Sequence, residues 1–170
     1  MVVAIRKINK KVLWDPTPAP NEKLPDGELR ADALAELKTT ENKLSVFIVD
    51  GIAPERLLTA LGCAGRDNVG AVDYIEFDYD VINALGLQIL DAPGETPDTA
   101  VNLCHRDLAQ LTASKLAEFA NRLFRDGVKK RLVDKEVGKL VNIGIKNGNI
   151  DSAQIKETFL KDLQRERYKP

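Results

Sequence analysis

The sequence predicts an α+β fold, or a small α/β fold, in which helices cover a short mixed sheet and a helical C-terminal unit follows. Residues 44–49, LSVFIV, form a nearly continuous apolar run with β-branched residues, which is typical of a buried strand. Residues 71–77 place apolar and polar side chains on opposite faces of a second strand, and residues 112–126 repeat apolar side chains at helical spacing. The chain has 170 residues, of which 44% are hydrophobic and 30% charged, so it can bury a core.

The first 27 residues are predicted to be a basic N-terminal arm and a proline-rich linker. Residues 1–14 mix basic and apolar side chains, and we expect an edge strand or a mobile arm there. Residues 15–27 contain four prolines, which favour extended backbone. Residues 28–38 then have apolar side chains on one helical face, and Asp26 is a candidate N-cap.

The middle of the chain is predicted to alternate helices and strands. Pro54 suits the first turn of a helix, and Asp78 or Asp80 can cap a later one. The connection between the first two strands is long enough for a right-handed parallel crossover. A long loop closes this region, and loops of that length are often functional. The expected elements are a helix over residues 54–61, a strand over 71–77, a helix over 81–85, a strand over 87–90 and a loop over 91–102.

Three helices are predicted in the C-terminal unit, over residues 112–126, over about 128–145, and from Asp151 onward. Gly138 inside the second helix costs about 1 kcal/mol relative to alanine, which indicates that another group packs closely against it. The last residues, 165–169, are expected to fray.

Charge divides the chain into regions of opposite sign. Residues 51–110 contain 3 basic and 10 acidic side chains, whereas residues 111–170 contain 14 basic and 8 acidic ones. We therefore expect an acidic α/β core over residues 28–110 and a basic three-helix unit over residues 111–170 that packs on it. Such asymmetry favours an acidic partner or nucleic acid at the basic end, unless the two regions pair within the chain.

The two cysteines, Cys63 and Cys104, are too few for a disulfide framework. The chain shows no secretory signal, and its apolar runs are too short to cross a bilayer. We therefore expect a cytoplasmic protein without a membrane partner, and no motif calls for a metal or another cofactor.

The densest acidic cluster lies on the second strand and just after it. Asp73, Glu76 and Asp78 could form a surface that binds a partner. Glu76 and Asp78 are two residues apart on one strand face and could instead hold a hard cation such as Mg²⁺. His105 is the chain's one histidine, so any histidine-dependent chemistry must use it. These three, Glu76, Asp78 and His105, are weak catalytic candidates if they converge in one cleft.

The basic region offers the opposite surface. Its candidate partner-binding residues are Lys129, Lys130, Arg131, Lys135 and Lys139. We expect a non-enzymatic protein-interaction or accessory subunit that uses its two oppositely charged surfaces. Two alternatives remain. One is a nucleic-acid-binding protein, in which the basic helices contact phosphates. The other is a metal-dependent hydrolase or nuclease that uses the acidic cluster.

Overall fold

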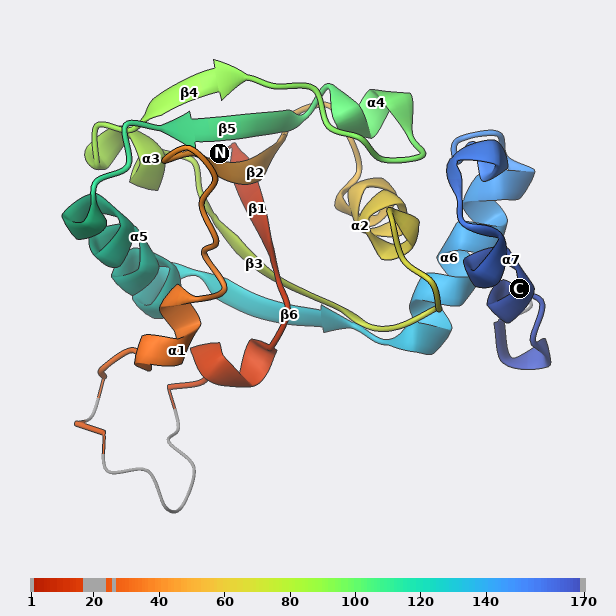
Figure 1. Ribbon diagram of the computed structural model, residues 1–170, viewed down its shortest axis with the longest axis horizontal. Helices are drawn as coiled ribbons and strands as arrows, with labels where there is room; N and C mark the ends of the chain where they lie inside the picture. Colours follow the sequence, from red (N-terminus) through yellow and green to blue (C-terminus); the bar gives the residue numbers. More distant parts are fainter. Residues whose placement is uncertain (1, 17–23, 26, 169–170) are drawn as a thin grey trace. The chain divides into compact units, whose positions relative to one another are not determined.

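The computed structural model describes residues 2–16, 24–25 and 27–168 (Figure 1). Most of the predicted proline-rich linker, the expected N-cap Asp26 and the end of the tail at Lys169 lie outside the described residues. The chain divides into two compact units. Unit 1 comprises Met1–Ile48, Asp73–Asp91 and Arg106–Lys130, and unit 2 comprises Val49–Val72, Ala92–His105 and Arg131–Pro170.

Unit 1 contains a six-stranded sheet with the strand order β4-β5-β2-β1-β3-β6. β1 pairs antiparallel with β3, and β4 pairs antiparallel with β5. The predicted α+β class is confirmed. The strands are β1 (Val3–Ile8), β2 (Leu44–Val49), β3 (Val72–Asp78), β4 (Gln88–Asp91), β5 (His105–Ala109) and β6 (Val128–Leu132).

The N-terminal strand lies inside the sheet, so its expected edge position was wrong. β1 has β2 on one side and β3 on the other. The side chains of Ala4, Ile5 and Ile8 are buried, which an edge strand exposed to water would not require. β1 also separates β2 from β3 in the sheet.

Two strands were missed. β5 begins at His105, three residues after the end of the predicted loop at residue 102, and β6 occupies the start of the predicted second C-terminal helix. That helix, α6 (Asp134–Lys146), begins six residues later than the expected Val128. Val128 and Leu132 are four residues apart, a spacing that fits one face of a helix and also one face of a strand. The segment is a strand because it pairs with β3 at the edge of the sheet.

The core of unit 1 lies between the sheet and helix α5 (Ala113–Asp126). Thr112 caps this helix as predicted, since its hydroxyl oxygen accepts a hydrogen bond from the Lys115 N–H at 3.2 Å. Phe119 is fully buried and meets Phe77 edge to face, with ring centroids 5.4 Å apart. The remaining helices of this unit are η1 (Lys11–Trp14), α1 (Ala31–Leu34) and α3 (Asp80–Ala84), and α1 is much shorter than the helix predicted over residues 28–38.

Unit 2 is helical, and its two longest helices pack side by side in opposite directions. A Cβ atom added to Gly62 would lie 2.7 Å from Val137, and one added to Gly144 would lie 3.5 Å from Thr59. The end of α2 therefore lies beside the start of α6, and the helices are antiparallel. The elements are α2 (Pro54–Cys63), α4 (Thr99–Asn102), α6, η2 (Ser152–Gln154), α7 (Glu157–Leu163) and η3 (Glu166–Tyr168).

The C-terminal tail is folded against α6, so the expectation that residues 165–169 fray was wrong for the described residues. Tyr168 has no exposed surface. A Cβ atom added to Gly138 would lie 2.4 Å from the Tyr168 ring, which identifies the close packing predicted at this glycine. Asn142 also donates a hydrogen bond of 2.8 Å to the Tyr168 carbonyl, and Arg167 pairs with Asp134 at 3.4 Å.

Among the described residues, no helix has both the length and the apolar character needed to cross a membrane.

Candidate functional site

The acidic residues of β3 are engaged within unit 1. The Asp73 side chain is 4% exposed and accepts a hydrogen bond from the Lys11 N–H at 2.9 Å, so it holds the turn after β1. Glu76 pairs with Lys130 of β6 at 2.6 Å, and Asp78 accepts a hydrogen bond from the Asp80 N–H at 3.0 Å. Within the described part of the chain, no three side chains of His, Cys, Asp or Glu gather as metal ligands.

The basic residues of β6 are also engaged, at least in part. The Lys129 ammonium donates a hydrogen bond to the Phe124 carbonyl and lies 5.3 Å from the Phe124 ring centroid, and its partial burial lowers its pKa. The hydrogen bond to Glu76 raises the pKa of Lys130. This pair joins the acidic and basic regions at the edge of the sheet, and the pair of Lys156 with Asp67 joins them in unit 2.

His105 belongs to unit 2, whereas Glu76 and Asp78 belong to unit 1. Its Nδ1 makes a short hydrogen bond to the Ala92 carbonyl, which can only accept, so Nδ1 carries the proton. The imidazole also lies against Gly94, where an added Cβ would be 3.2 Å from its Cβ. In this arrangement His105 ties the start of β5 to the preceding loop.

That loop is held by a buried ion pair that sequence reasoning missed. The Asp98 carboxylate is fully buried and accepts two hydrogen bonds from Arg56 of α2, at 2.6 and 2.9 Å. One of its oxygens also caps α4 by accepting from the N–H groups of Ala100 and Val101. The hydrogen bond to Asp98 raises the pKa of Arg56. Because the two residues are 42 positions apart, no local pattern could pair them.

Both cysteines are free thiols with little exposure. Burial raises the pKa of the Cys63 thiol to about 12, and its S–H lies 3.4 Å from the Thr59 and Ala60 carbonyls. Cys63 is therefore neutral and unreactive near neutral pH.

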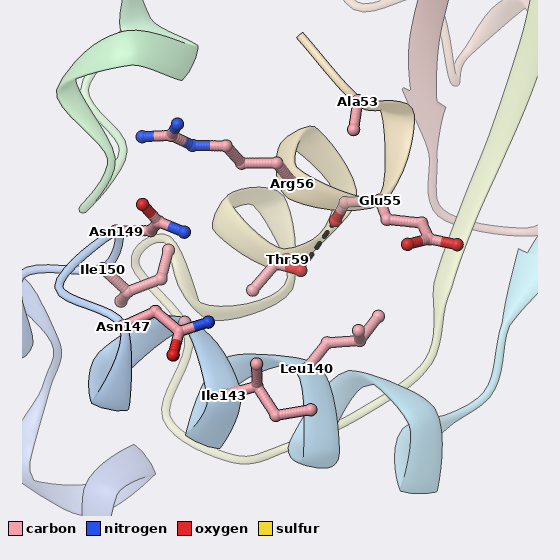
Figure 2. Close-up of a pocket in the computed structure, with 10 residues that line it drawn as sticks. Ala53, Glu55, Arg56, Thr59, Leu140, Ile143, Asn147, Asn149 and Ile150 are labelled. Atoms are coloured by element: carbon pink, nitrogen blue, oxygen red, sulfur yellow. Dashed lines mark hydrogen bonds between the residues drawn. The ribbon is translucent and has the colours of Figure 1, made fainter.

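Unit 2 has a groove of about 280 Å³ between α2 and α6 (Figure 2). It is lined by Ala53, Glu55, Arg56, Thr59, Leu140, Ile143, Gly144, Asn147, Asn149 and Ile150. Figure 2 shows the α2 side chains on one side and the α6 side chains on the other, with Glu55 and Arg56 extending in opposite directions. We call this surface the α2–α6 groove.

Helix geometry explains why the groove is open and apolar. Val137, Val141 and Gly144 form the buried face of α6. Leu140 and Ile143 lie on the neighbouring face, where Ile143 is 41% exposed. At Gly144 the Ile150 side chain packs directly against the helix backbone, because a Cβ there would lie 2.6 Å from Ile150. The result is an aliphatic floor that the chain's own helices leave partly uncovered.

The rim of the groove is polar. Within the described residues, the side chains of Glu55, Asn147 and Asn149 have no hydrogen bond or ion pair, and all three are exposed. Backbone hydrogen bonds from Asn149 and Ile150 to the Gly144 carbonyl, at 2.9 and 3.1 Å, fix the turn that carries the two amides. An aliphatic floor with unengaged polar groups around it is the composition of a binding site.

The sequence contained a signal for this groove that was assigned to the core. The apolar residues expected on the buried face of this helix were Val133, Val137, Leu140 and Val141, and of these Val137 and Val141 are buried. Val133 is 44% exposed and Leu140 is partly exposed. A second apolar stripe on a helix that already has one is the pattern that could have indicated a contact surface.

Comparisons with protein-family models, with curated protein sequences and with solved structures found no match to this chain.

Proposed function

We propose that this chain is a non-enzymatic protein-interaction module, an accessory subunit that binds a segment of another protein in the α2–α6 groove. The observation that carries the proposal is the exposure of Leu140 and Ile143 on the groove floor. They lie beside polar side chains that have no partner among the described residues. Grooves between two helices that expose aliphatic side chains are used to bind peptide segments, most often amphipathic helices. A pair of free thiols agrees with a reducing compartment, and we propose the cytoplasm.

Site-specific photo-cross-linking tests this proposal in the native host. A photoreactive residue placed at Ile143 should give adducts of discrete mass, and mass spectrometry should map them to one segment of one protein. The matched control carries the same residue at Leu103, an aliphatic side chain of unit 2 that is 69% exposed and does not line the groove. Equal labelling from both positions, or none from Ile143, would overturn the proposal.

A second candidate function is nucleic-acid binding by α6. The side chains of Lys135 and Lys139 support it, since neither forms an ion pair within the described residues. Binding to a DNA duplex or to single-stranded RNA should then weaken steeply with salt. Binding that is absent at 50 mM salt would exclude this function.

A further inference from the structure

We propose that the segment bound in the α2–α6 groove is an acidic amphipathic helix. Its apolar side chains would cover Leu140 and Ile143, and its carboxylates would face a row of lysines along α6. This inference rests on the proposed function, because it names the chemistry of the partner that the groove accepts.

The lysine row consists of Lys135, Lys139 and Lys146. At 3.6 residues per turn these positions fall within about 40° of one another around α6, and they span roughly 16 Å along it. Within the described residues none of their ammonium groups has a hydrogen bond or an ion pair. The row therefore presents three unneutralised positive charges on one helix face.

Where the structure describes unit 2, most of its other basic side chains pair with a carboxylate. The pairs are Arg56–Asp98, Lys156–Asp67, Lys161–Glu157, Arg165–Asp162 and Arg167–Asp134. Unpaired charge is thus concentrated on α6 and is not a general property of the surface. An acidic partner is the complement of such a row.

The row borders the apolar floor of the groove. Lys139 precedes Ile143 by four positions and Lys146 follows it by three, so both are its neighbours on the helix surface. One helix lying in the groove could contact Ile143 with apolar side chains and the lysines with acidic ones. A nucleic acid would meet the lysines and leave Leu140 and Ile143 uncovered, so the combination favours a protein helix.

The opposite wall determines which way the partner faces. Glu55 is exposed on the α2 side, and the charge of Arg56 is taken up by Asp98. Carboxylates of the partner are therefore repelled from α2 and attracted to α6. We expect a partner helix with acidic residues on one flank, aliphatic residues at i, i+4 and i+7, and neutral or basic residues on the other flank.

Fluorescence anisotropy with designed peptides tests the inference on the full chain. The probe is a fluorescein-labelled 16-residue helix with leucines at i, i+4 and i+7 and glutamates on one flank. We compare it with a scrambled peptide of the same composition, a peptide with lysine in place of every glutamate, and a 16-nucleotide single strand. The acidic helix should bind at least tenfold more tightly than either control peptide.

Charge reversal locates the site. Lys139→Glu with Lys146→Glu should weaken binding at least tenfold, because reversing each exposed contact changes affinity severalfold. Lys161→Glu is the matched control, since Lys161 is exposed and already paired with Glu157, and it should leave binding within twofold. Circular dichroism confirms that each variant is folded.

The outcomes separate this inference from the proposed function. If the photo-cross-link at Ile143 maps to one protein segment but the lysine reversals leave binding of the acidic helix unchanged, the groove binds proteins and the acidic partner is wrong. A further variant, Ile143→Asp, places a charge on the groove floor. If this variant binds every peptide as the parent does and no cross-link forms at Ile143, both proposals fail. Tighter binding of the oligonucleotide, lost in the lysine variants but kept in Ile143→Asp, would overturn the acidic helix in favour of nucleic acid.

Discussion

Gly138 and Tyr168 form one packing unit, so substitutions at the two positions should not be additive. The Tyr168 ring is fully buried against α6, and Tyr168→Ala should lower the free energy of unfolding by about 3–5 kcal/mol, the usual cost of removing a buried aromatic side chain. Tyr168→Phe removes only the hydroxyl group, which accepts a hydrogen bond from Arg167, and should cost about 1 kcal/mol.

Gly138→Ala should act by displacing that ring. The new Cβ would lie 2.4, 2.6 and 2.8 Å from three Tyr168 carbons, too close for the ring to stay. The loss should approach that of Tyr168→Ala, reduced by the gain of about 1 kcal/mol for alanine over glycine in a helix. With Tyr168 replaced by alanine, the ring contacts at 2.4 and 2.6 Å are gone and only the contact with Cβ at 2.8 Å remains, so the same substitution should cost about 2 kcal/mol less than it does in the parent.

Urea unfolding followed by circular dichroism at 222 nm measures all four members of this double-mutant cycle. The expected result is a strong dependence on Tyr168: Gly138→Ala should lower the free energy of unfolding much more when Tyr168 is present than when alanine replaces it. If Gly138→Ala lowers stability equally in both backgrounds, the ring does not depend on the glycine, and the explanation is refuted.

Three further predictions concern the buried ion pair, the buried thiol and a strained turn. Asp98→Asn keeps a side chain that can cap α4 but removes the charge facing Arg56, so it should lower the free energy of unfolding, measured with urea, by about 2–3 kcal/mol. This loss is smaller than that expected for breaking a fully buried ion pair, because the Arg56 side chain is 36% exposed. Above pH 9 the Cys63 thiol ionises in the unfolded chain, whereas burial keeps it neutral in the folded chain until about pH 12. The free energy of unfolding should therefore fall as pH rises through this range, by up to about 1.4 kcal/mol per pH unit. Cys63→Ala removes the thiol and should show a smaller decline. Glu41 and Asn42 have φ angles of 52° and 58° in a tight turn, so Glu41→Asn should stabilise by about 0.5–1 kcal/mol, since asparagine tolerates this backbone better than glutamate.

Each of these predictions has a control that could contradict it. Asp67→Asn breaks an exposed pair with Lys156 and should cost less than about 1 kcal/mol; an equal loss for Asp98→Asn would mean that burial adds nothing. Parallel stability curves of the parent and Cys63→Ala from pH 9 to 12 would contradict the thiol prediction. Glu41→Val should destabilise the turn, and a gain from both Glu41 substitutions would show that backbone conformation is not the cause.

The sequence correctly predicted the elements that are defined by neighbouring residues in the chain. The β-branched run of β2, the first-turn proline of α2 and the Thr112 cap of α5 each lie where expected. Gly138 indicated a close contact, although its partner, 30 positions later, was unknown. In all of these the signal lies within a few residues of the element that it defines.

The missed features depend on distant partners. β5 is a strand because it pairs with β4, and its first three residues, His105, Arg106 and Asp107, are polar and only partly buried, which gives no strand signal. The α2–α6 groove requires knowledge of which face of α6 meets α2. Gly62 and Gly144 determine which face of α6 packs on α2, because the two helices come close together at these glycines. Ile143 lies on a different face of α6 and stays exposed.

The interleaving of the two units has a consequence for dissecting the protein. The chain passes from one unit to the other five times, and a single break anywhere between residues 49 and 129 divides both units. Truncation in this range therefore yields no fragment with a complete unit, and deletion mapping would lose every activity together. The same property suits the chain to fragment complementation, because two pieces broken there must associate to complete either unit.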